Sequence, residues 1–114
     1  MPGPRSSLVE VALPVPVRRL FTYRVAGAPP PAGTAVRVPF RKRTLTGWVV
    51  GGGTEVAGVR DVLGVMDSRL GAGSELLELA RWIADYYVAP LGVVLRAMLP
   101  PPGRATPRRR LVAR

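Results

Sequence analysis

The first two-thirds of the chain alternates apolar and polar residues in short runs that prolines and glycines interrupt. Alternation with a period of two is typical of strands that bury one face. The pattern predicts five strands, at 8–13, 20–25, 34–40, 45–50 and 59–66, with a proline-rich loop at 27–33 and a flexible glycine turn at 51–53. Five short strands within about sixty residues favour a small barrel or half-open barrel.

The same alternation predicts which side chains face the inside of this barrel. Pro14 and Pro16 lack a backbone donor, so the first strand must end there or lie at an edge. Alternate apolar residues in the first three strands should share one face each: Val9, Val11 and Leu13, then Phe21, Tyr23 and Val25, then Val36, Val38 and Phe40.

The last third of the chain changes to a helical period. Ser74 is a suitable N-cap for a first helix, and Pro90 suits the first position of a second, shorter helix. The predicted buried faces hold Leu76, Leu79, Ala80, Ile83, Ala84 and Tyr87 in the first helix and Leu91, Val94, Leu95 and Met98 in the second. We therefore expect a disordered N-terminus at 1–7, a mainly β domain with two C-terminal helices at 8–102, and a basic linker or tail at 103–114.

The chain is strongly basic. Its 17 Lys and Arg residues against 7 Asp and Glu give a net charge of +10 and a pI near 11.7. Because unpaired charge is costly to bury, most of this surplus must lie on the surface. Such a field attracts polyanions, of which nucleic acid is the first candidate, an anionic membrane the second and an acidic protein the third.

The residues that most enzymes need are missing from the sequence. The absence of Cys and His excludes disulfides and cysteine-based zinc sites, and it removes the commonest general base. No GxxxxGK[ST] loop for ATP is present, and the carboxylates are scattered. No apolar run reaches the roughly 18 residues that span a bilayer, and the N-terminus lacks the apolar stretch of a signal peptide. We therefore expect a cytoplasmic binding module without catalysis, cofactor or membrane partner.

Basic residues gather in the predicted turns beside aromatic residues. Phe21 and Phe40 are close in sequence to two of these groups. Cationic loops beside aromatic residues on a small barrel are typical of single-strand binding, in which phosphates neutralise charge and bases stack. The alternative is that the arginines are solvated turn residues and that both phenylalanines belong to the core. The groups are Arg18 with Arg19, then Arg41, Lys42 and Arg43, then Arg60.

Four sequence blocks carry a resemblance to a known family. They are Val11–Tyr23 (VALPVPVRRLFTY), Val36–Val50 (VRVPFRKRTLTGWVV), Val62–Asp67 (VLGVMD) and Leu79–Pro100, which begins LARWIADYY. In order and in register, over roughly residues 8 to 102, these blocks resemble the N-terminal part of the PriA family of replication-restart proteins.

The resemblance implies a circularly permuted, OB-like barrel that captures the 3′ end of the nascent leading strand at a fork. It places Phe21 and Thr22 on the first wall of a pocket for the terminal nucleotide, Arg41 on the second and Arg60 on the third. The family has an acidic residue where this chain has Thr22, and a glycine where it has Arg41. Thr22 offers no charge to orient a terminal hydroxyl, and Arg41 adds a phosphate-seeking group.

The family's full-length protein also carries a winged-helix segment, helicase lobes that use ATP and Mg²⁺, and a cysteine-rich zinc site, none of which is in this sequence. The resemblance therefore implies a monomeric, nucleoid-associated module for primosome assembly that binds 3′-ended DNA at stalled forks or D-loops. One alternative is a protein-interaction module that docks on the acidic tail of single-strand-binding protein or on other primosome components. Another is an unrelated barrel that binds RNA.

Overall fold

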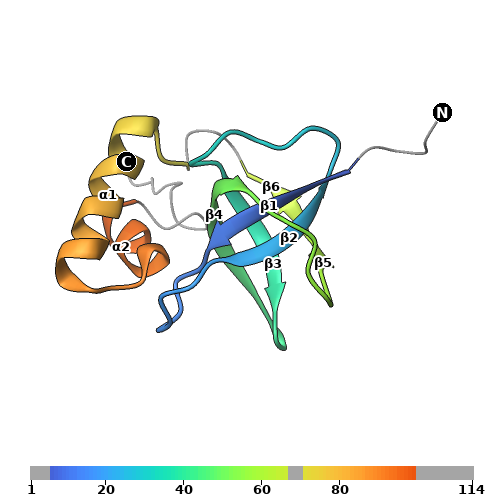
Figure 1. Cartoon of the computed structure of the whole chain (residues 1–114), viewed down its shortest axis with the longest axis horizontal. Helices are drawn as coiled ribbons and strands as arrows, with labels where there is room; N and C mark the ends of the chain where they lie inside the picture. Colours follow the sequence, from blue (N-terminus) through green and yellow to red (C-terminus); the bar gives the residue numbers. More distant parts are fainter. Residues whose placement is uncertain (1–5, 67–70, 100–114) are drawn as a thin grey trace, which may run out of the picture.

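The computed structural model describes residues 6–66 and 71–99. In this part of the chain, six strands form one curled sheet and two helices follow it (Figure 1). The mainly β fold with two C-terminal helices is thus confirmed. The elements are β1 (Ser6–Ala12), β2 (Phe21–Ala26), β3 (Ala35–Phe40), β4 (Arg43–Gly52), β5 (Arg60–Asp61), β6 (Gly64–Val65), α1 (Ser74–Tyr87) and α2 (Leu91–Met98).

The sheet has the strand order β5-β2-β1-β4-β3-β6. Antiparallel pairing joins β1 to β2 and β4, and β3 to β4, whereas β5 runs parallel to β2. The short segment from β5 to β6 bonds to both edges of the sheet: Val62 N–H donates to the Arg24 carbonyl at 2.8 Å and Leu63 N–H to the Arg37 carbonyl at 2.7 Å. The sheet therefore curls into a half-barrel, as expected of an OB-like fold.

The inside of the half-barrel is filled by the residues that strand alternation predicts. Val11, Val36 and Val38 are fully buried, and Phe21 and Phe40 pack against the same cluster from its rim. Tyr23 also points inward, and its hydroxyl donates to the Pro39 carbonyl at 2.8 Å. Because this hydroxyl is paired, the otherwise aliphatic core tolerates it.

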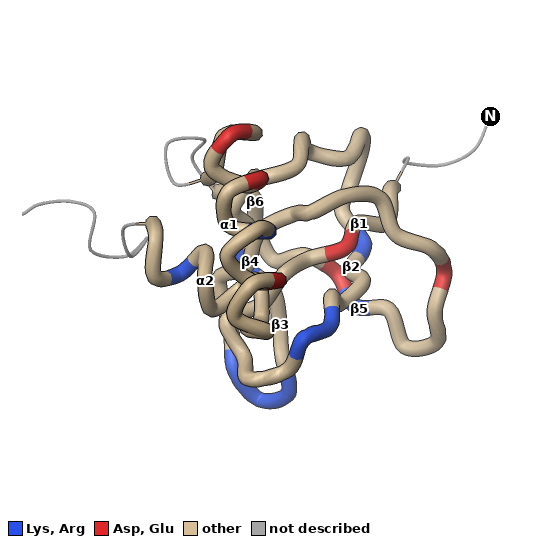
Figure 2. Tube along the Cα trace, turned by 60° about the vertical axis from the view of Figure 1, so that its left-hand side comes forward, with Lys and Arg blue, Asp and Glu red and all other residues tan. Residues whose placement is uncertain are grey.

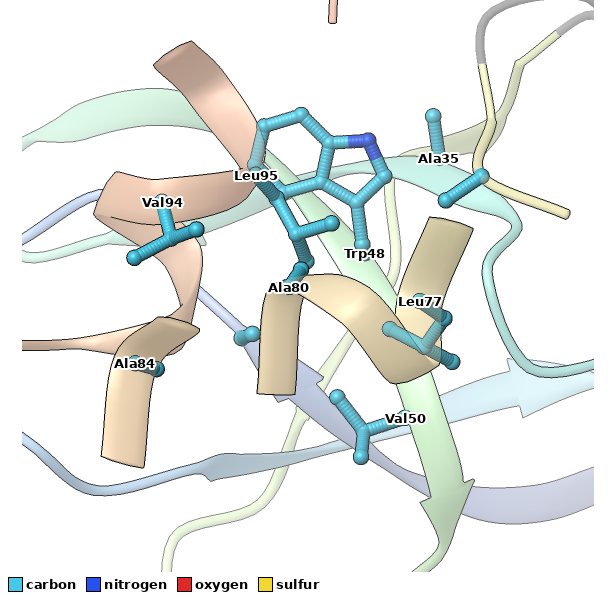
Figure 3. Packing of buried hydrophobic residues seen from close by; sticks show 10 residues of the cluster. Ala35, Trp48, Val50, Leu77, Ala80, Ala84, Val94 and Leu95 are labelled. Carbon is cyan, nitrogen blue, oxygen red and sulfur yellow. The ribbon is translucent and has the colours of Figure 1, made fainter. Parts of the chain in front are cut away.

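A second core lies between the sheet and the helices. Figure 3 shows the indole of Trp48, from β4, among side chains of both helices, including Leu77, Ala80 and Leu95. Leu95 and Ala80 are fully buried, and the small side chain of Ala80 lets α1 approach the sheet closely. The Trp48 indole N–H is buried and has no hydrogen-bond partner among the described residues.

At Gly92, helix α2 lies close to the backbone of the half-barrel. A Cβ atom at this position would lie 2.0 Å from the carbonyl oxygen of Leu13, far inside van der Waals contact. The first turn of α2 therefore packs directly on the backbone that leaves β1. This contact fixes the helices beside the loop that follows β1.

Two strand predictions differ from the structure. The glycine turn expected at 51–53 is wrong for Gly51 and Gly52, because both extend β4 and pair with β1 across a shift of register between Glu10 and Val11. The residue left without a partner at this shift is Val50, which lies between Val49 and Gly51. The single strand expected at 59–66 is two short strands, which gives six strands instead of five. The strand β1 starts at Ser6, inside the segment expected to be disordered, whereas residues 1–5 and 103–114 lie outside the described residues.

The helix ends and the buried face of α1 also differ in detail. Gly73 and Pro90 are the N-caps, so Ser74 is the first helical residue and not the cap. Leu77 is buried, whereas Leu79 is 48% exposed and Tyr87 is 68% exposed. Apolar residues surround most of this helix, so periodicity alone does not single out the face that packs on the sheet.

Candidate nucleic-acid interface

Two connections project from the same side of the half-barrel, the β1–β2 loop and the β3–β4 turn (Figure 1). Each carries one of the basic runs, and Figure 2 shows the two blue runs on the same, lower side of the molecule. The order of the chain explains this placement. Because β1 and β4 are antiparallel neighbours in the sheet, the loop that follows β1 and the turn that precedes β4 lie at the same end.

The β1–β2 loop is shaped by local hydrogen bonds and proline. Val15 N–H donates to the Leu13 carbonyl and Val17 N–H to the Val15 carbonyl, each at 2.8 Å, which is the spacing of tight three-residue turns. Pro14 and Pro16 restrict the backbone between these bonds. Val15 is buried at 7% exposure, so the loop is also anchored to the barrel core. The hydrogen bonds, the prolines and the buried Val15 thus restrict the part of the loop that precedes Arg19.

The β3–β4 turn has only two residues, Arg41 and Lys42, because Phe40 pairs with Arg43. Arg41 has a φ of 58°, in the left-handed region that glycine adopts most readily. Two-residue hairpin turns require a positive φ, so the turn length imposes this conformation on an arginine. The strain costs about 1 kcal/mol.

An open hollow of about 630 Å³ lies between the two connections. Ligand sites in proteins commonly have volumes of about 300–1,000 Å³. Phe21 and Phe40 meet there edge to face, with ring centroids 5.2 Å apart at 77°. The hollow is lined by Val15, Pro16, Val17, Arg19, Phe21, Phe40, Arg41 and Arg43.

Cations cover both aromatic rings of the hollow. The guanidinium carbon of Arg19 lies 4.9 Å from the centroid of Phe21, and that of Arg41 lies 5.4 Å from the centroid of Phe40. Such cation–π contacts hold a guanidinium in place without an acidic partner. Arg19, from the β1–β2 loop, and Arg41, from the β3–β4 turn, therefore bracket the aromatic pair from two sides.

The hollow has an unbalanced positive charge. None of its lining residues is acidic, and the ion pairs of the described residues lie elsewhere, between Arg18 and Asp85 at 3.1 Å and between Arg24 and Glu55 at 3.3 Å. Each guanidinium offers five N–H donors and no acceptor. The arrangement can therefore bind phosphate oxygens and stack bases on guanidinium or aromatic planes.

The structure places the predicted site residues in two groups. Phe21, Arg19, Arg41 and Arg43 meet at the hollow, whereas Lys42 is exposed at the turn beside it and does not line it. The Arg18 side chain turns to the helices, where it donates to Asp85 and to the Ala89 carbonyl. Their contacts with a nucleic acid stay predictions.

Thr22 and Arg60 also lie outside the lining of the hollow. Thr22 faces away from Phe21, and its methyl group would be 3.0 Å from a Cβ atom at Gly53. Arg60 pairs with Tyr23 across β5 and β2. Burial raises the pKa of the Tyr23 hydroxyl, and the positive charge of Arg60 opposes part of that rise.

Sequence reasoning missed two features of the surface. One is the apolar wall of the hollow formed by Val15, Pro16 and Val17; the Pro–Val–Pro–Val pattern signals a stiff, apolar loop and not only the end of a strand. The other is an exposed aromatic cluster on α1, in which the ring of Trp82 stacks on that of Tyr86 with centroids 5.2 Å apart. The rings of Tyr86 and Tyr87 meet edge to face with centroids 4.9 Å apart.

None of the described helices is both long enough and apolar enough to pass through a membrane.

The half-barrel with its basic, aromatic hollow has the features of a small nucleic-acid-binding barrel domain. Residues 10–100 match the family model of the PriA 3′ DNA-binding domain (3′BD). The chain therefore belongs to the family of PriA 3′ DNA-binding domains.

Three curated relatives of the chain are named replication restart protein PriA. The chain is 34% identical over 70 residues to the protein of Rickettsia conorii, a match that covers 60% of this chain and 11% of the relative. It is 31% identical over 103 residues to the protein of Treponema pallidum, covering 81% and 16% respectively. It is 36% identical over 70 residues to the protein of Chlamydia pneumoniae, covering 60% and 9%. The chain thus spans less than a fifth of the length of these relatives.

Proposed function

We propose that this domain holds the 3′ end of the leading strand at stalled forks or D-loops, as the DNA-binding part of a replication-restart protein. The observation that carries the proposal is the hollow itself, in which Phe21 and Phe40 lie between Arg19 and Arg41. A strand end can enter such an open hollow, stack its terminal base and place its last phosphates on the guanidinium groups.

The hollow lies at one end of the half-barrel. This position favours the binding of the end of a DNA strand over the binding of its middle. The two connections lie on either side of the hollow, and Val15–Val17 form the apolar wall on the side of the β1–β2 loop. A continuous strand must enter and leave past these walls, whereas a terminal nucleotide needs only one entrance. Phosphates upstream of the end can then run along exposed cations such as Lys42.

Fluorescence anisotropy on forked DNA tests the proposal. One fork carries a 3′-terminated arm at the junction, and the other lacks it but has the same duplex arms. We expect tighter, salt-sensitive binding to the first fork and a clear loss of that difference in Phe21→Ala and Phe40→Ala. Equal, salt-insensitive binding to both forks would rule the proposal out.

A second candidate function is docking on a protein partner, and the aromatic cluster on α1 favours it. Trp82, Tyr86 and Tyr87 are 61%, 67% and 68% exposed, which is unusual for residues that bury so much apolar surface on contact. The partners that we propose for this surface are the acidic tail of single-strand-binding protein and other primosome components. Competition between a tail peptide and DNA, repeated with Trp82→Ala, separates this function from DNA binding: docking predicts peptide binding that the substitution removes while DNA binding remains.

A further inference from the structure

A second cavity, of about 230 Å³, lies between the β1–β2 loop and the helices. Loop residues from Val17 to Leu20, the end of β1 and residues of α1 and α2 line it. Its lining shares Val17 and Arg19 with that of the hollow, whose further residues include Phe21 of β2 and three residues of the β3–β4 hairpin. The β1–β2 loop therefore borders both, with the helix-side cavity toward α1 and α2 and the hollow toward the β3–β4 hairpin.

Two of the three arginines that line the helix-side cavity already have partners. Arg18 donates to Asp85, the cavity's one carboxylate, at 3.1 Å and to the Ala89 carbonyl at 3.2 Å. The guanidinium of Arg19 lies over Phe21, in the hollow. The charge of the cavity is therefore not balanced within it, and the surplus belongs to the third arginine.

This third arginine, Arg81 of α1, is held in position with donors to spare. It donates to the Val50 carbonyl at 3.3 Å, and it takes part in neither of the two ion pairs found among the described residues. A guanidinium has five N–H donors, so most of those on Arg81 are open to a ligand. The ligand that fits an exposed, oriented guanidinium without a carboxylate of its own is a phosphate oxygen.

The stretch of loop that leads into both linings is stiff and apolar. Pro14 to Val17 carry no polar side chain, and two tight turns and two prolines restrict their backbone. Pro16 is exposed, and Val17 is 44% exposed although it lines both the hollow and the helix-side cavity. DNA-binding proteins use such apolar side chains as wedges that unstack bases.

The DNA end assigned to the hollow does not arrive alone. A leading-strand end at a fork is paired with its template, so a second backbone lies beside it. The terminal base can stack on Phe21 and Phe40 only after it has left its partner base. A binding site for two parting strands needs a cation for each backbone and an apolar element between them. The hollow, Arg81 and the Pro14–Val17 segment supply these three parts.

We propose that the helix-side cavity binds a backbone phosphate of the template strand through Arg81, so that the β1–β2 loop stands between the template and the 3′ end in the hollow. The inference rests on the proposed function, because it places the second strand of the same DNA junction.

The test measures anisotropy of the full 114-residue chain with two DNAs that share one labelled, 3′-ended strand. In the first DNA this strand is single, and in the second it is annealed to a template that extends past its 3′ end. We expect Arg81→Ala to weaken binding of the annealed DNA about three- to tenfold and to reduce its salt slope by about 0.7–0.9. Binding of the single strand should stay unchanged.

Two further variants control for charge and for folding. Arg96→Ala removes an exposed arginine of α2 that does not line the helix-side cavity, so it should affect both DNAs alike. Arg81→Gln keeps a donor for the Val50 carbonyl but has no charge, so it should reproduce the effect of Arg81→Ala on the salt slope.

A fluorescent base in the template tests the position of the loop. 2-Aminopurine opposite the terminal nucleotide brightens when it loses its stacking and pairing. We expect a rise when the chain binds the annealed DNA at saturation, and a smaller rise with Val17→Ser, which keeps both prolines. No rise with the unaltered chain would overturn the inference.

The outcomes separate the inference from the proposed function. If Arg81→Ala weakens both DNAs equally, the cavity takes phosphates of the same strand, and the inference fails. If it weakens neither, the inference also fails. In both cases end-binding stands as long as Phe21→Ala still weakens the 3′-ended single strand. If neither DNA depends on Phe21, the inference and the proposed function fail together.

Discussion

Arg18 joins the β1–β2 loop to the end of α1 through Asp85, with 3.1 Å between the guanidinium and the carboxylate. Its Nε also donates to the Ala89 carbonyl at 3.2 Å. The next residue, Arg19, lies over the ring of Phe21, with its guanidinium carbon 4.9 Å from the ring centroid. The two consecutive arginines thus differ in their contacts. Arg18 connects the loop to the helices, and Arg19 forms part of the hollow.

Replacing Arg18 should therefore affect DNA binding indirectly. Arg18→Ala frees the loop from the helices, and we expect a loss of affinity of about two- to fivefold, the range of an exposed ion pair. The slope of log affinity against log salt should stay unchanged, because no phosphate contact is lost. Arg19→Ala should instead reduce that slope by about 0.7 for a single strand. Asp85→Asn is the matched control and should reproduce Arg18→Ala; an equal drop in slope for both arginine variants would contradict this division of tasks.

The left-handed conformation of Arg41 predicts opposite effects on stability and binding. Arg41→Gly removes backbone strain, so the free energy of unfolding in urea should rise by about 0.5–1 kcal/mol. DNA affinity should fall, because a cation leaves the hollow. Lys42→Gly is the control, since Lys42 has no positive φ in the structure and should lose stability. A loss of stability in Arg41→Gly would show that the turn is not strained.

The C-cap of α1 is a second strained position. Val88 has a φ of 53°, which is costly for a β-branched residue, and the residue is 69% exposed. Val88→Gly should raise the free energy of unfolding by about 1 kcal/mol. Val93→Gly, at an exposed site inside α2, should lower it by about 0.5–1 kcal/mol. Thermal and urea unfolding of both variants check this contrast.

The close packing of Gly92 on Leu13 predicts a large loss of stability. A methyl group in Gly92→Ala would overlap the Leu13 backbone, so α2 must shift away from the half-barrel. We expect a loss of about 2–3 kcal/mol in the free energy of unfolding. Gly51→Ala, whose added Cβ meets nothing within 4 Å, should change stability by less than about 0.5 kcal/mol. Similar values for the two variants would contradict the described contact.

The buried Tyr23 hydroxyl predicts a loss of stability in alkali. Its folded pKa lies above the ordinary value of 10.0, chiefly because of burial. Above pH 10.0 the unfolded chain releases this proton first, so the unfolded state binds fewer protons than the folded state and stability falls as pH rises. Below pH 10.0 the contribution of the protonated Tyr23 hydroxyl to the free energy of unfolding is fully present. Urea unfolding at pH 9 to 11 should show this fall, and Tyr23→Phe should lessen it; an unchanged profile in the variant would assign the fall to other groups.

Strand alternation predicted the barrel interior well because burial there obeys a period of two. Val9, Val11, Val36 and Val38 all fill the core as expected. Alternation failed at Gly51 and Gly52, where pairing with β1 overrides the low strand propensity of glycine. Tertiary pairing of this kind leaves no local signal in the sequence.

The candidate site was predictable only in part. The basic turns and the two phenylalanines are visible in the sequence, and the structure brings Phe21 and Phe40 together. Sequence cannot tell Arg18 from Arg19, because the direction of each side chain depends on where α1 packs. The exposure of Tyr87 was equally hidden, since an aromatic residue at helical spacing usually belongs to the core.

Chemical-shift mapping shows directly whether a strand end enters the hollow. A short 3′-ended oligonucleotide is titrated into the isotope-labelled chain, and the amide shifts are followed residue by residue. We expect the largest changes in the β1–β2 loop at Val15–Phe21 and in the turn at Phe40–Arg43, with smaller changes for an oligonucleotide circularised to remove its ends. Largest changes on α1 around Trp82 and Tyr86, or equal changes for the circular and the ended strand, would contradict end-binding in the hollow.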